Sequence, residues 1–355
     1  MLKYLRWFLL PFSWLYGLVI LTRNWCYDAG IFKSHSFNIP VISVGNLDVG
    51  GAGKSPMTEY LIRLLKNNHK LATLSRGYGR KTQGFLKATQ ASTATEIGDE
   101  PAQFKQKFPD ITVAVCESRV AGINQLKANI DLVILDDAYQ HRAVKPGLSI
   151  LLFDYSRIFE PHFMLPAGNL REPFGGIKRA NIIIISKCPH TLADAEQQAI
   201  VQRIKPLANQ SVFFTAINYS SLYPVNSRAG TTQIDKDTVV FIITGIANPA
   251  PLLNHVKKQA KQVIHHNYPD HHQFTLKNIT KLADEFLACP ADKKLILTTE
   301  KDIQRLREHE LVAGFKQLPL WVLPIEVQFL NNNQAGFNNI IQNYVRQYKA
   351  NRQLH

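Results

Sequence analysis

Cysteine is scarce in this chain of 355 residues, which contains only Cys26, Cys116, Cys188 and Cys289. Their spacing matches neither a metal-binding nor a redox motif, so the sequence predicts the reduced thiols of a cytosolic protein. Low-complexity segments, internal repeats and nucleic-acid-recognition motifs are also absent. These absences argue against a cysteine-based metal centre and against a nucleic-acid-binding protein.

Acidic residues are in the minority, with 27 Asp and Glu against 41 Lys and Arg, which leaves a net charge of +14. Such an excess favours an anionic partner, namely nucleic acid, anionic lipid or a phosphorylated substrate. The chain is too long for one typical domain, and its 45% hydrophobic content is enough for sizeable cores. No obligate protein partner is predicted.

Charged side chains are also absent from residues 7–22, which form the apolar stretch WFLLPFSWLYGLVILT. The stretch is shorter than the roughly 20 residues of a spanning helix. No small-residue cleavage site follows it, which argues against a signal peptide. Its aromatic residues suit the headgroup region of a bilayer. We predict a membrane-interface helix within residues 1–30, monotopic or peripheral; a buried core helix and a true span are the alternatives.

Short apolar runs alternate with helical segments in the first part of the chain. They predict an α/β fold of the P-loop NTPase type, with a doubly wound, mostly parallel sheet in a kinase domain over residues 31–215. A polar connection over 216–237 leads to a second, smaller α/β lobe over 238–355. The expected strands are Val41–Val44, Leu71–Leu74, Ile111–Val115, Leu132–Leu135, Ser149–Phe153 and Ile182–Ile185, then Val239–Thr244, Gln262–His266, Leu295–Thr299 and Leu320–Pro324.

A glycine-rich loop follows the first expected strand, in the sequence PVISVGNLDVGGAGKSP from Pro40. Such a loop turns backbone N–H groups toward the phosphates of a nucleotide such as ATP, while a lysine reaches the β- and γ-phosphates and a hydroxyl ligates Mg²⁺. The strict pattern requires glycine at position 48, and an ordinary glycine-rich turn is the alternative. The predicted nucleotide-binding residues are Asp48, Val49, Gly50, Gly51, Ala52, Gly53, Lys54 and Ser55.

Two further segments each contain a pair of neighbouring carboxylates. Asp136 and Asp137 end an apolar strand, as in a Walker B motif, and would support Mg²⁺ together with Ser55; a solvated turn is the alternative. Asp99 and Glu100 lie in a loop before a proline. They predict either acids at a helix N-terminus or a general base for a sugar hydroxyl.

Four histidines gather in the second lobe, at His265, His266, His271 and His272. A zinc cluster, a histidine that orients an acid across a cleft, and solvated or core histidines are the three interpretations. Cations in loops give candidate contacts to phosphate or sugar, with charged surface loops as the alternative. These candidates for substrate binding are Arg76, Arg80, Arg119 and Arg171.

Together these motifs closely resemble the tetraacyldisaccharide 4′-kinase (lipid A 4′-kinase) family. The matching segments are the N-terminal membrane segment, V-G-N-L…G-G-A-G-K-S-P, L-S-R-G-Y-G-R, G-D-E-P, L-D-D-A-Y-Q-H, L-P-A-G-N-L-R-E-P, P-D-H-H-Q-F and T-T-E-K-D, in the order of the family and over residues 1 to about 302. Ser55 replaces the commoner threonine of the loop, and position 48 varies in the family. The last fifty residues carry no matching motif.

The resemblance implies transfer of the ATP γ-phosphoryl group to the 4′-hydroxyl of a lipid A disaccharide 1-phosphate, at the cytoplasmic face of the inner membrane. It also implies that Asp99 is the catalytic base, that His271 forms a dyad with it, and that Asp136 and Asp137 support the metal. Lys54 would then offset charge on the phosphates. A membrane-associated P-loop ATPase that switches a partner or assembly is the alternative hypothesis.

Overall fold

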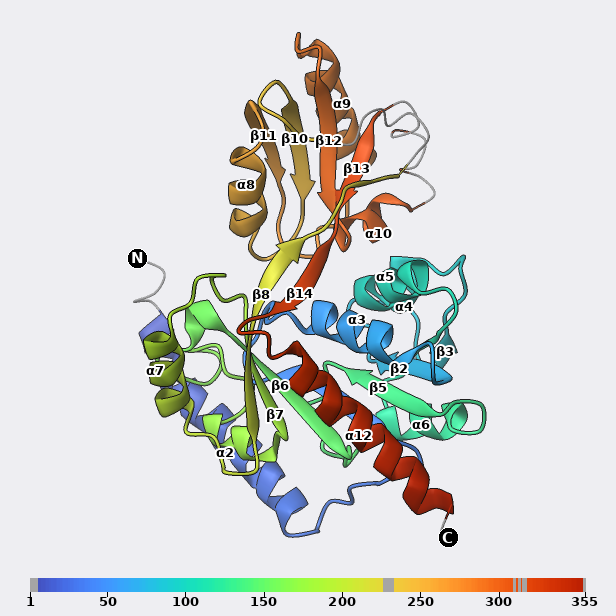
Figure 1. Cartoon of the computed structure of the whole chain (residues 1–355), viewed down its shortest axis with the longest axis vertical. Coiled ribbons are helices and arrows are strands. Elements are labelled where there is room, and N and C mark those ends of the chain that lie inside the picture. The colour runs from blue at the N-terminus through green and yellow to red at the C-terminus, as the bar shows by residue number, and fades with distance from the viewer. Residues whose placement is uncertain (1–5, 226–232, 309–310, 312–313, 315–317, 354–355) are drawn as a thin grey trace.

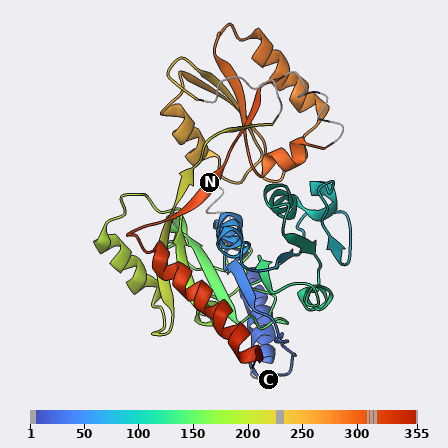
Figure 2. The same cartoon turned by 45° about the vertical axis from the view of Figure 1, so that its right-hand side comes forward.

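Two lobes stack along the long axis of the molecule in the structure, a computed structural model (Figures 1 and 2). It describes residues 6–225, 233–308, 311, 314 and 318–353. The larger lobe is built on a nine-stranded sheet and the smaller lobe on a five-stranded sheet. Two antiparallel strands, β8 (Ser211–Tyr219) and β14 (Ile325–Phe329), run from the larger sheet toward the smaller lobe.

The larger sheet has the order β14-β8-β7-β6-β1-β5-β2-β4-β3, and its central pairs are parallel. Its central strands are buried on both faces, so apolar residues run continuously through them, as in Ile182–Ser186. This confirms the predicted doubly wound α/β fold. Besides β8 and β14, the strands are β1 (Val41–Asn46), β2 (Leu71–Ser75), β3 (Leu86–Lys87), β4 (Thr112–Val115), β5 (Leu132–Asp136), β6 (Leu148–Asp154) and β7 (Ile182–Ser186).

Helices cover both faces of this sheet. One face packs against α3 (Lys54–Leu65), α5 (Asp99–Lys107) and α12 (Gln334–Gln353). The other face packs against α6 (Arg119–Leu126) and α7 (Asp194–Ile204). Short elements complete the lobe: η1 (Arg6–Leu9), α4 (Ala94–Ile97), η2 (Tyr155–Arg157) and η3 (Phe174–Arg179).

The smaller lobe is a second α/β unit with the sheet order β11-β10-β12-β13-β9. Its core lies between this sheet and the helices, and Phe241 and Leu282 are fully buried there. The strands are β9 (Tyr223–Pro224), β10 (Val239–Thr244), β11 (Gln262–Asn267), β12 (Lys294–Thr299) and β13 (Leu320–Leu323); the helices are α8 (Ala250–Lys257), α9 (Leu276–Ala288) and α10 (Asp302–Leu306).

The end of the chain differs from the interpretation that assigned residues 238–355 to the second lobe. After β13 the chain returns to the larger sheet through β14, and α12 packs on that sheet. Phe337, Ile341 and Val345 recur at helical spacing and are fully buried in the first core, which explains the return. Residues 226–232 of the expected connection lie outside the described part of the chain.

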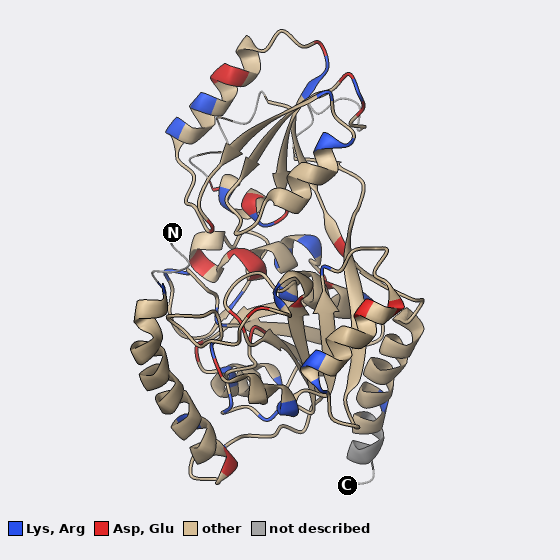
Figure 3. Cartoon of the chain, turned by 90° about the vertical axis from the view of Figure 1, so that its left-hand side faces the viewer, with Lys and Arg blue, Asp and Glu red and all other residues tan. Residues whose placement is uncertain are grey.

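The N-terminal apolar stretch forms α2 (Leu10–Asp28), a helix on the outside of the larger lobe. Only Ser13 and Gly17 are buried in it, and its outer face exposes large apolar side chains such as Trp14 and Leu18. Figure 3 shows α2 free of charge except toward its C-terminal end. No described helix is both long enough and apolar enough to cross a bilayer.

Candidate active site

The glycine-rich loop joins the end of β1 to the start of α3. Gly50 and Gly53 adopt φ values of 102° and 80°, which side chains other than glycine rarely tolerate. Lys54 begins α3, and its Nζ lies 3.1 Å from Oδ1 of Asn46, the last residue of β1. The loop therefore has the strand–loop–helix context that a phosphate-binding loop requires.

The Asp-Asp segment begins at the end of β5, and the residues that follow it pack directly against the end of β1. A Cβ atom on Gly45 would lie 2.6 Å from Cβ of Tyr139, so glycine is required for the close approach. Asp136 is buried and accepts a hydrogen bond of 3.0 Å from Thr58 on α3. Burial, with the neighbouring Asp137 and Glu100 carboxylates, raises the pKa of Asp136 to about 7. The two predicted motifs thus meet at the carboxyl ends of adjacent parallel strands.

Asp137 pairs with two cations, Lys54 and Arg171. Its carboxylate lies 3.7 Å from Nζ of Lys54 and accepts hydrogen bonds of 2.8 and 3.2 Å from Arg171. Burial opposes ionisation of Asp137, but Lys54 and Arg171 outweigh it and lower the pKa of the carboxyl group. Its left-handed backbone, with φ at 48°, turns Asp137 away from the strand direction that Asp136 follows.

The segment before Arg171 runs beside the glycine-rich loop and links it to the N-terminal helix. Val49 N donates to Asn169 O at 2.8 Å, and Arg171 N donates to Leu47 O at 2.7 Å. On its other side, Tyr16 of α2 donates to Arg171 O at 2.8 Å. The apolar helix is therefore attached to the same segment that positions Arg171.

Two cations at the loop were missed by the sequence analysis. Arg157 donates to Val49 O at 2.8 Å, and Lys187 contacts Gly51 O and lies 2.8 Å from Asp154. Lys187 directly follows β7, the strand beside β6. The sequence could have indicated Lys187, because it follows an apolar parallel strand and ligands bind at the carboxyl ends of such strands.

The four candidate arginines have different surroundings. Arg76 is exposed at the end of β2, whereas the Arg80 side chain is only 3% exposed and pairs with Glu117. Arg119 is buried, donates to Glu117 O at 3.0 Å, and has no partner for Nε among the described residues. Burial lowers the pKa of Arg119, and the Asp137 carboxylate opposes this shift.

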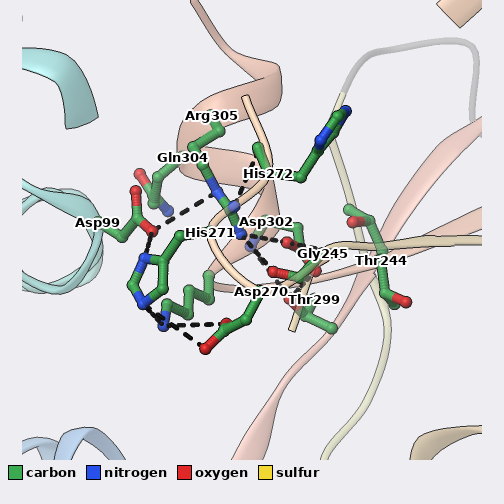
Figure 4. Close-up of polar contacts among 12 residues, drawn as sticks. Asp99, Thr244, Gly245, Asp270, His271, His272, Thr299, Asp302, Gln304 and Arg305 are labelled. Atoms are coloured by element: carbon green, nitrogen blue, oxygen red, sulfur yellow. Dashed lines mark hydrogen bonds and ion pairs between the residues drawn. The ribbon is translucent and has the colours of Figure 1, made fainter. Parts of the chain in front are cut away.

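A carboxylate–imidazole pair joins the two lobes. Asp99 lies at the start of α5 in the larger lobe, and its Oδ2 is 2.9 Å from Nδ1 of His271 in the smaller lobe. Arg305 of α10 approaches the same oxygen, with Nε at 3.5 Å. Figure 4 shows these three side chains turned toward one another. The structure thus brings together two residues that are 172 positions apart in the sequence.

Arg305 also holds the loop that carries His271. It is buried and donates to His272 O at 2.9 Å and to Gly245 O at 3.0 Å, and it pairs with Asp302. His271 adopts a φ of 58°, and its N–H donates to Gly245 O at 3.0 Å. No sequence motif had singled out Arg305.

The other three histidines of the cluster point to separate partners. His265 lies 2.8 Å from Thr244 Oγ1, His266 lies 3.2 Å from Glu285, and His272 lies 3.1 Å from Asn278. Within the described residues, no group of three or more His, Cys, Asp or Glu side chains could hold a metal ion. These contacts favour a positioning role for His271 over a zinc cluster.

Comparison with known proteins places this geometry in context. The profile of the tetraacyldisaccharide-1-P 4′-kinase family matches residues 5–346. A tetraacyldisaccharide 4′-kinase of Bacteroides thetaiotaomicron is 43% identical over 99% of this chain and 96% of its own length. The corresponding protein of Flavobacterium psychrophilum is 44% identical over 99% of this chain and 100% of its own.

A solved structure is similar over nearly the whole length. It is that of LpxK from Aquifex aeolicus in complex with ATP, with a TM-score of 0.72 and 29% sequence identity. The match covers 96% of this chain and 99% of that chain. Both lobes and the connection between them therefore lie within the region of similarity.

Proposed function

The chain belongs to the tetraacyldisaccharide-1-P 4′-kinase family, and we propose that it transfers the γ-phosphoryl group of ATP to the 4′-hydroxyl of a tetraacyldisaccharide 1-phosphate, in lipid A biosynthesis. It is an ATP-dependent phosphotransferase with an alcohol group as acceptor. The observation that carries the mechanism is the Asp99–His271 pair, which joins the two lobes. Glu100, next to Asp99, is close enough to Asp136 for its charge to contribute to the raised pKa of that carboxyl group.

The donor site is the loop from Asp48 to Ser55. Its backbone N–H groups and the N-terminal end of α3 favour phosphate oxygens. Lys54 offsets charge on the β- and γ-oxygens as the bond to the leaving phosphate breaks. Arg157 and Lys187 stabilise the loop through its carbonyl oxygens at Val49 and Gly51.

The side chains near Lys54 suit Mg²⁺. Ser55, Asp136 and Asp137 offer only hard oxygen donors, and the protein alone presents no complete ligand set among the described residues. Mg²⁺ commonly takes one or two carboxylates and completes its shell with water and substrate phosphates. When bound with ATP, it would neutralise charge on the β- and γ-phosphates. Arg171 and Lys54 hold the Asp137 carboxylate in place for this role.

Asp99 acts as the base. The 4′-hydroxyl oxygen forms the new bond to the γ-phosphorus, the bond to the β-phosphate oxygen breaks, and the hydroxyl proton passes to the Asp99 carboxylate. His271 and Arg305 hold this carboxylate on its Oδ2 side. A positioned base of this kind contributes about 10²–10⁴ in rate.

The acceptor approaches from a lipid surface. Helix α2 is attached to the segment that carries Arg171 and exposes its outer apolar face, so a membrane-bound helix would present the loop to a lipid substrate. Of the four candidate arginines, Arg80 pairs with Glu117 and Arg171 pairs with Asp137. Arg76 and Arg119 are therefore the two that we propose contact the anionic disaccharide. This arrangement supports a site at a membrane surface, and the surface that we propose is the cytoplasmic face of the inner membrane.

Incubation with γ-labelled ATP, Mg²⁺ and tetraacyldisaccharide 1-phosphate tests the proposal. We expect labelled lipid, in an amount that depends on Asp99 and Lys54. ATP hydrolysis that is independent of the lipid and yields no labelled lipid would contradict the kinase and support the alternative, a membrane-associated ATPase switch. Repeating the assay with EDTA measures the requirement for Mg²⁺.

A further inference from the structure

The loop that follows η2 carries apolar side chains on its outside. Phe159 is 56% exposed and Phe163 is 40% exposed, and Pro161 between them is exposed as well. Glu160 and His162, which alternate with these residues, are half-buried. We call these five residues the aromatic loop. Their order is the reverse of an ordinary surface loop, in which charged side chains face water and apolar ones pack inward. The reversal indicates that the outer side of the loop meets a partner other than water.

The two polar residues of the aromatic loop point toward the protein. Glu160 and His162 line a small cavity together with Asp48 of the phosphate loop. The ring of His162 stacks on that of Phe174, with 3.9 Å between the ring centroids. Burial, followed by the charge of Arg203, lowers the pKa of His162, so the ring is neutral in this position. The aromatic loop thus keeps its polar side chains inside and presents its apolar side chains outward.

Packing holds the aromatic loop in this arrangement. Ile158, just before the loop, is buried, and Leu170 N donates to Phe163 O at 3.1 Å. A Cβ atom on Gly168 would clash with Phe163 O, so glycine is required for this close approach. The fold therefore holds the exposed rings in place, and their exposure does not come from a fraying end of the chain.

The aromatic loop is continuous with the apolar surface of η1 and α2. The rings of Phe163 and Trp7 meet edge to face, with 6.1 Å between their centroids. Trp7 and its neighbour Phe8 are themselves exposed. Arg6, from the same turn, donates to Asn169 at 3.2 Å and adds a cation beside the patch. Isolated exposed apolar residues are ordinary, but a continuous apolar patch next to a cation suits an anionic lipid surface.

We propose that the aromatic loop is a second membrane-inserting element, which enters the headgroup region of the bilayer beside η1 and α2. This inference rests on the membrane contact in the proposed function. Aromatic side chains favour the headgroup region. A contact beside the helix restricts rotation of the larger lobe about the helix axis. Because Arg157, just before the loop, donates to Val49 O at 2.8 Å, insertion of the loop also sets the position of the phosphate loop relative to the lipid headgroups.

Sedimentation with vesicles of phosphatidylethanolamine and phosphatidylglycerol tests the role of the aromatic loop. For Phe159→Ser/Phe163→Ser we expect partitioning to weaken by about 10-fold, because each partly exposed ring gains only part of the free energy of full burial. Phe159→Leu/Phe163→Leu stays apolar and should keep most of the binding. Leu276→Ser, 55% exposed on α9 of the smaller lobe, is the matched control and should sediment as the wild type. Unchanged activity on detergent-dispersed substrate shows that each variant is folded.

Three other outcomes would contradict the proposal in different ways. If Phe159→Ser/Phe163→Ser sediments as the wild type while Trp14→Ser/Leu18→Ser is released, the loop is excluded and the membrane contact of α2 stands. If the wild type does not bind the vesicles, the membrane contact in the proposed function itself fails. If Phe159→Ser/Phe163→Ser lowers the mass of the protein in analytical ultracentrifugation but binds vesicles as before, the patch joins two copies of the chain, which overturns the proposal.

Fluorine NMR measures the insertion without removing an apolar side chain. The probe is para-trifluoromethylphenylalanine, incorporated at position 159 of the full chain and, as the control, at position 276. We expect the signal from position 159 to lose intensity when nitroxide-labelled lipid replaces plain lipid, and the signal from position 276 to keep it. Equal intensities for position 159 in the two lipids, with the protein bound, would show that the loop stays in water and would overturn the proposal.

Discussion

Asp99 combines burial with the role of proton acceptor that we propose for it, two features that rarely occur together in one side chain. It is 5% exposed at the start of α5, and Nε of Arg305 lies 3.5 Å from its Oδ2. Its partner His271 comes from the other lobe. A buried carboxylate that is held on one oxygen and available on the other is a suitable general base for a hydroxyl group.

Replacing Asp99 by Asn keeps the shape of the side chain and removes the base. We expect kcat for lipid phosphorylation to fall by about 10²–10⁴, with little change in ATP affinity, because the phosphate loop is untouched. Steady-state assays and ATP titration measure the two effects. Asp284→Asn, an exposed position on α9, is the control. Unchanged kcat in Asp99→Asn would remove Asp99 from the role of base.

His141 gives a prediction about pH and stability. Burial, followed by the charges of Arg119, Arg23 and Arg76, lowers its pKa from 6.5 to about 4. The unfolded chain therefore binds this proton more readily than the folded protein, so the stabilisation is fully present above pH 6.5 and is lost as the pH falls toward 4. The loss is about 1–3 kcal/mol.

Urea unfolding between pH 7 and pH 4, in the wild type and in His141→Asn, measures this contribution. The free energy of unfolding should decline more steeply with falling pH in the wild type than in the variant. The difference between the two proteins removes the contributions of all other titrating groups. Parallel curves would show that His141 is not the source.

At the scale of elements, the inner face of α2 packs on the larger lobe and its outer face is exposed. Its inner face is fixed to the larger lobe: Ser13 Oγ accepts from Ala167 N at 2.9 Å, and Gly17 packs close to Met164. Its outer face exposes Trp14 by 75% and Leu18 by 62%. Deleting the helix would therefore disturb the segment that carries Arg171, whereas changing the outer face would not.

The outer face can be tested with Trp14→Ser/Leu18→Ser. Each side chain gains about 1.5–3 kcal/mol on full burial, so we expect partitioning onto vesicles of anionic phospholipid to weaken by about 10²-fold. Activity on detergent-dispersed substrate should be retained. Leu287→Ser, 70% exposed on α9 in the smaller lobe, is the matched control. Equal sedimentation of both variants with vesicles would place the membrane contact elsewhere.

For the whole molecule, one buried ion-pair cluster ties the lobes together near the connecting strands. Lys107 of α5 lies 2.7 Å from Glu59 of α3 and also pairs with Glu300, which follows β12 of the smaller lobe. Both glutamates are buried, and burial, followed by the charge of Glu300, raises the pKa of Glu59. The ammonium group of Lys107 thus forms ion pairs with two carboxylates at the boundary between the lobes.

Lys107→Met removes the ammonium from both buried carboxylates and leaves Glu59 with only Arg63, at 3.3 Å, as a cationic partner. We expect the free energy of unfolding to fall by about 3–5 kcal/mol at pH 8, and by less at pH 5, because the raised pKa of Glu59 lets that carboxylate take up a proton as the pH falls. Adding Glu59→Gln to Lys107→Met should recover part of the loss, because one buried charge is then removed. If Lys107→Met unfolds like the wild type at both pH values, the cluster does not stabilise the arrangement of the lobes.

Features that depend on neighbours in the chain were predictable. The buried strands follow from short apolar runs, and the phosphate loop and the Asp136–Asp137 pair follow from residue order, since parallel strands bring their carboxyl ends to one edge of the sheet. The resemblance to a family added the roles of Asp99 and His271, which spacing alone had left among several interpretations.

Contacts between segments that are distant in the sequence could not be predicted from such local patterns. The return of β14 and α12 to the first sheet, the pairing of Arg80 with Glu117 and the contact of Lys301 with His271 all join residues far apart in the sequence. Local periodicity shows which face of an element is apolar, but it carries no information about which distant element covers that face. A cation in a loop looks the same whether it meets a substrate or a buried carboxylate, and only packing in three dimensions separates the two.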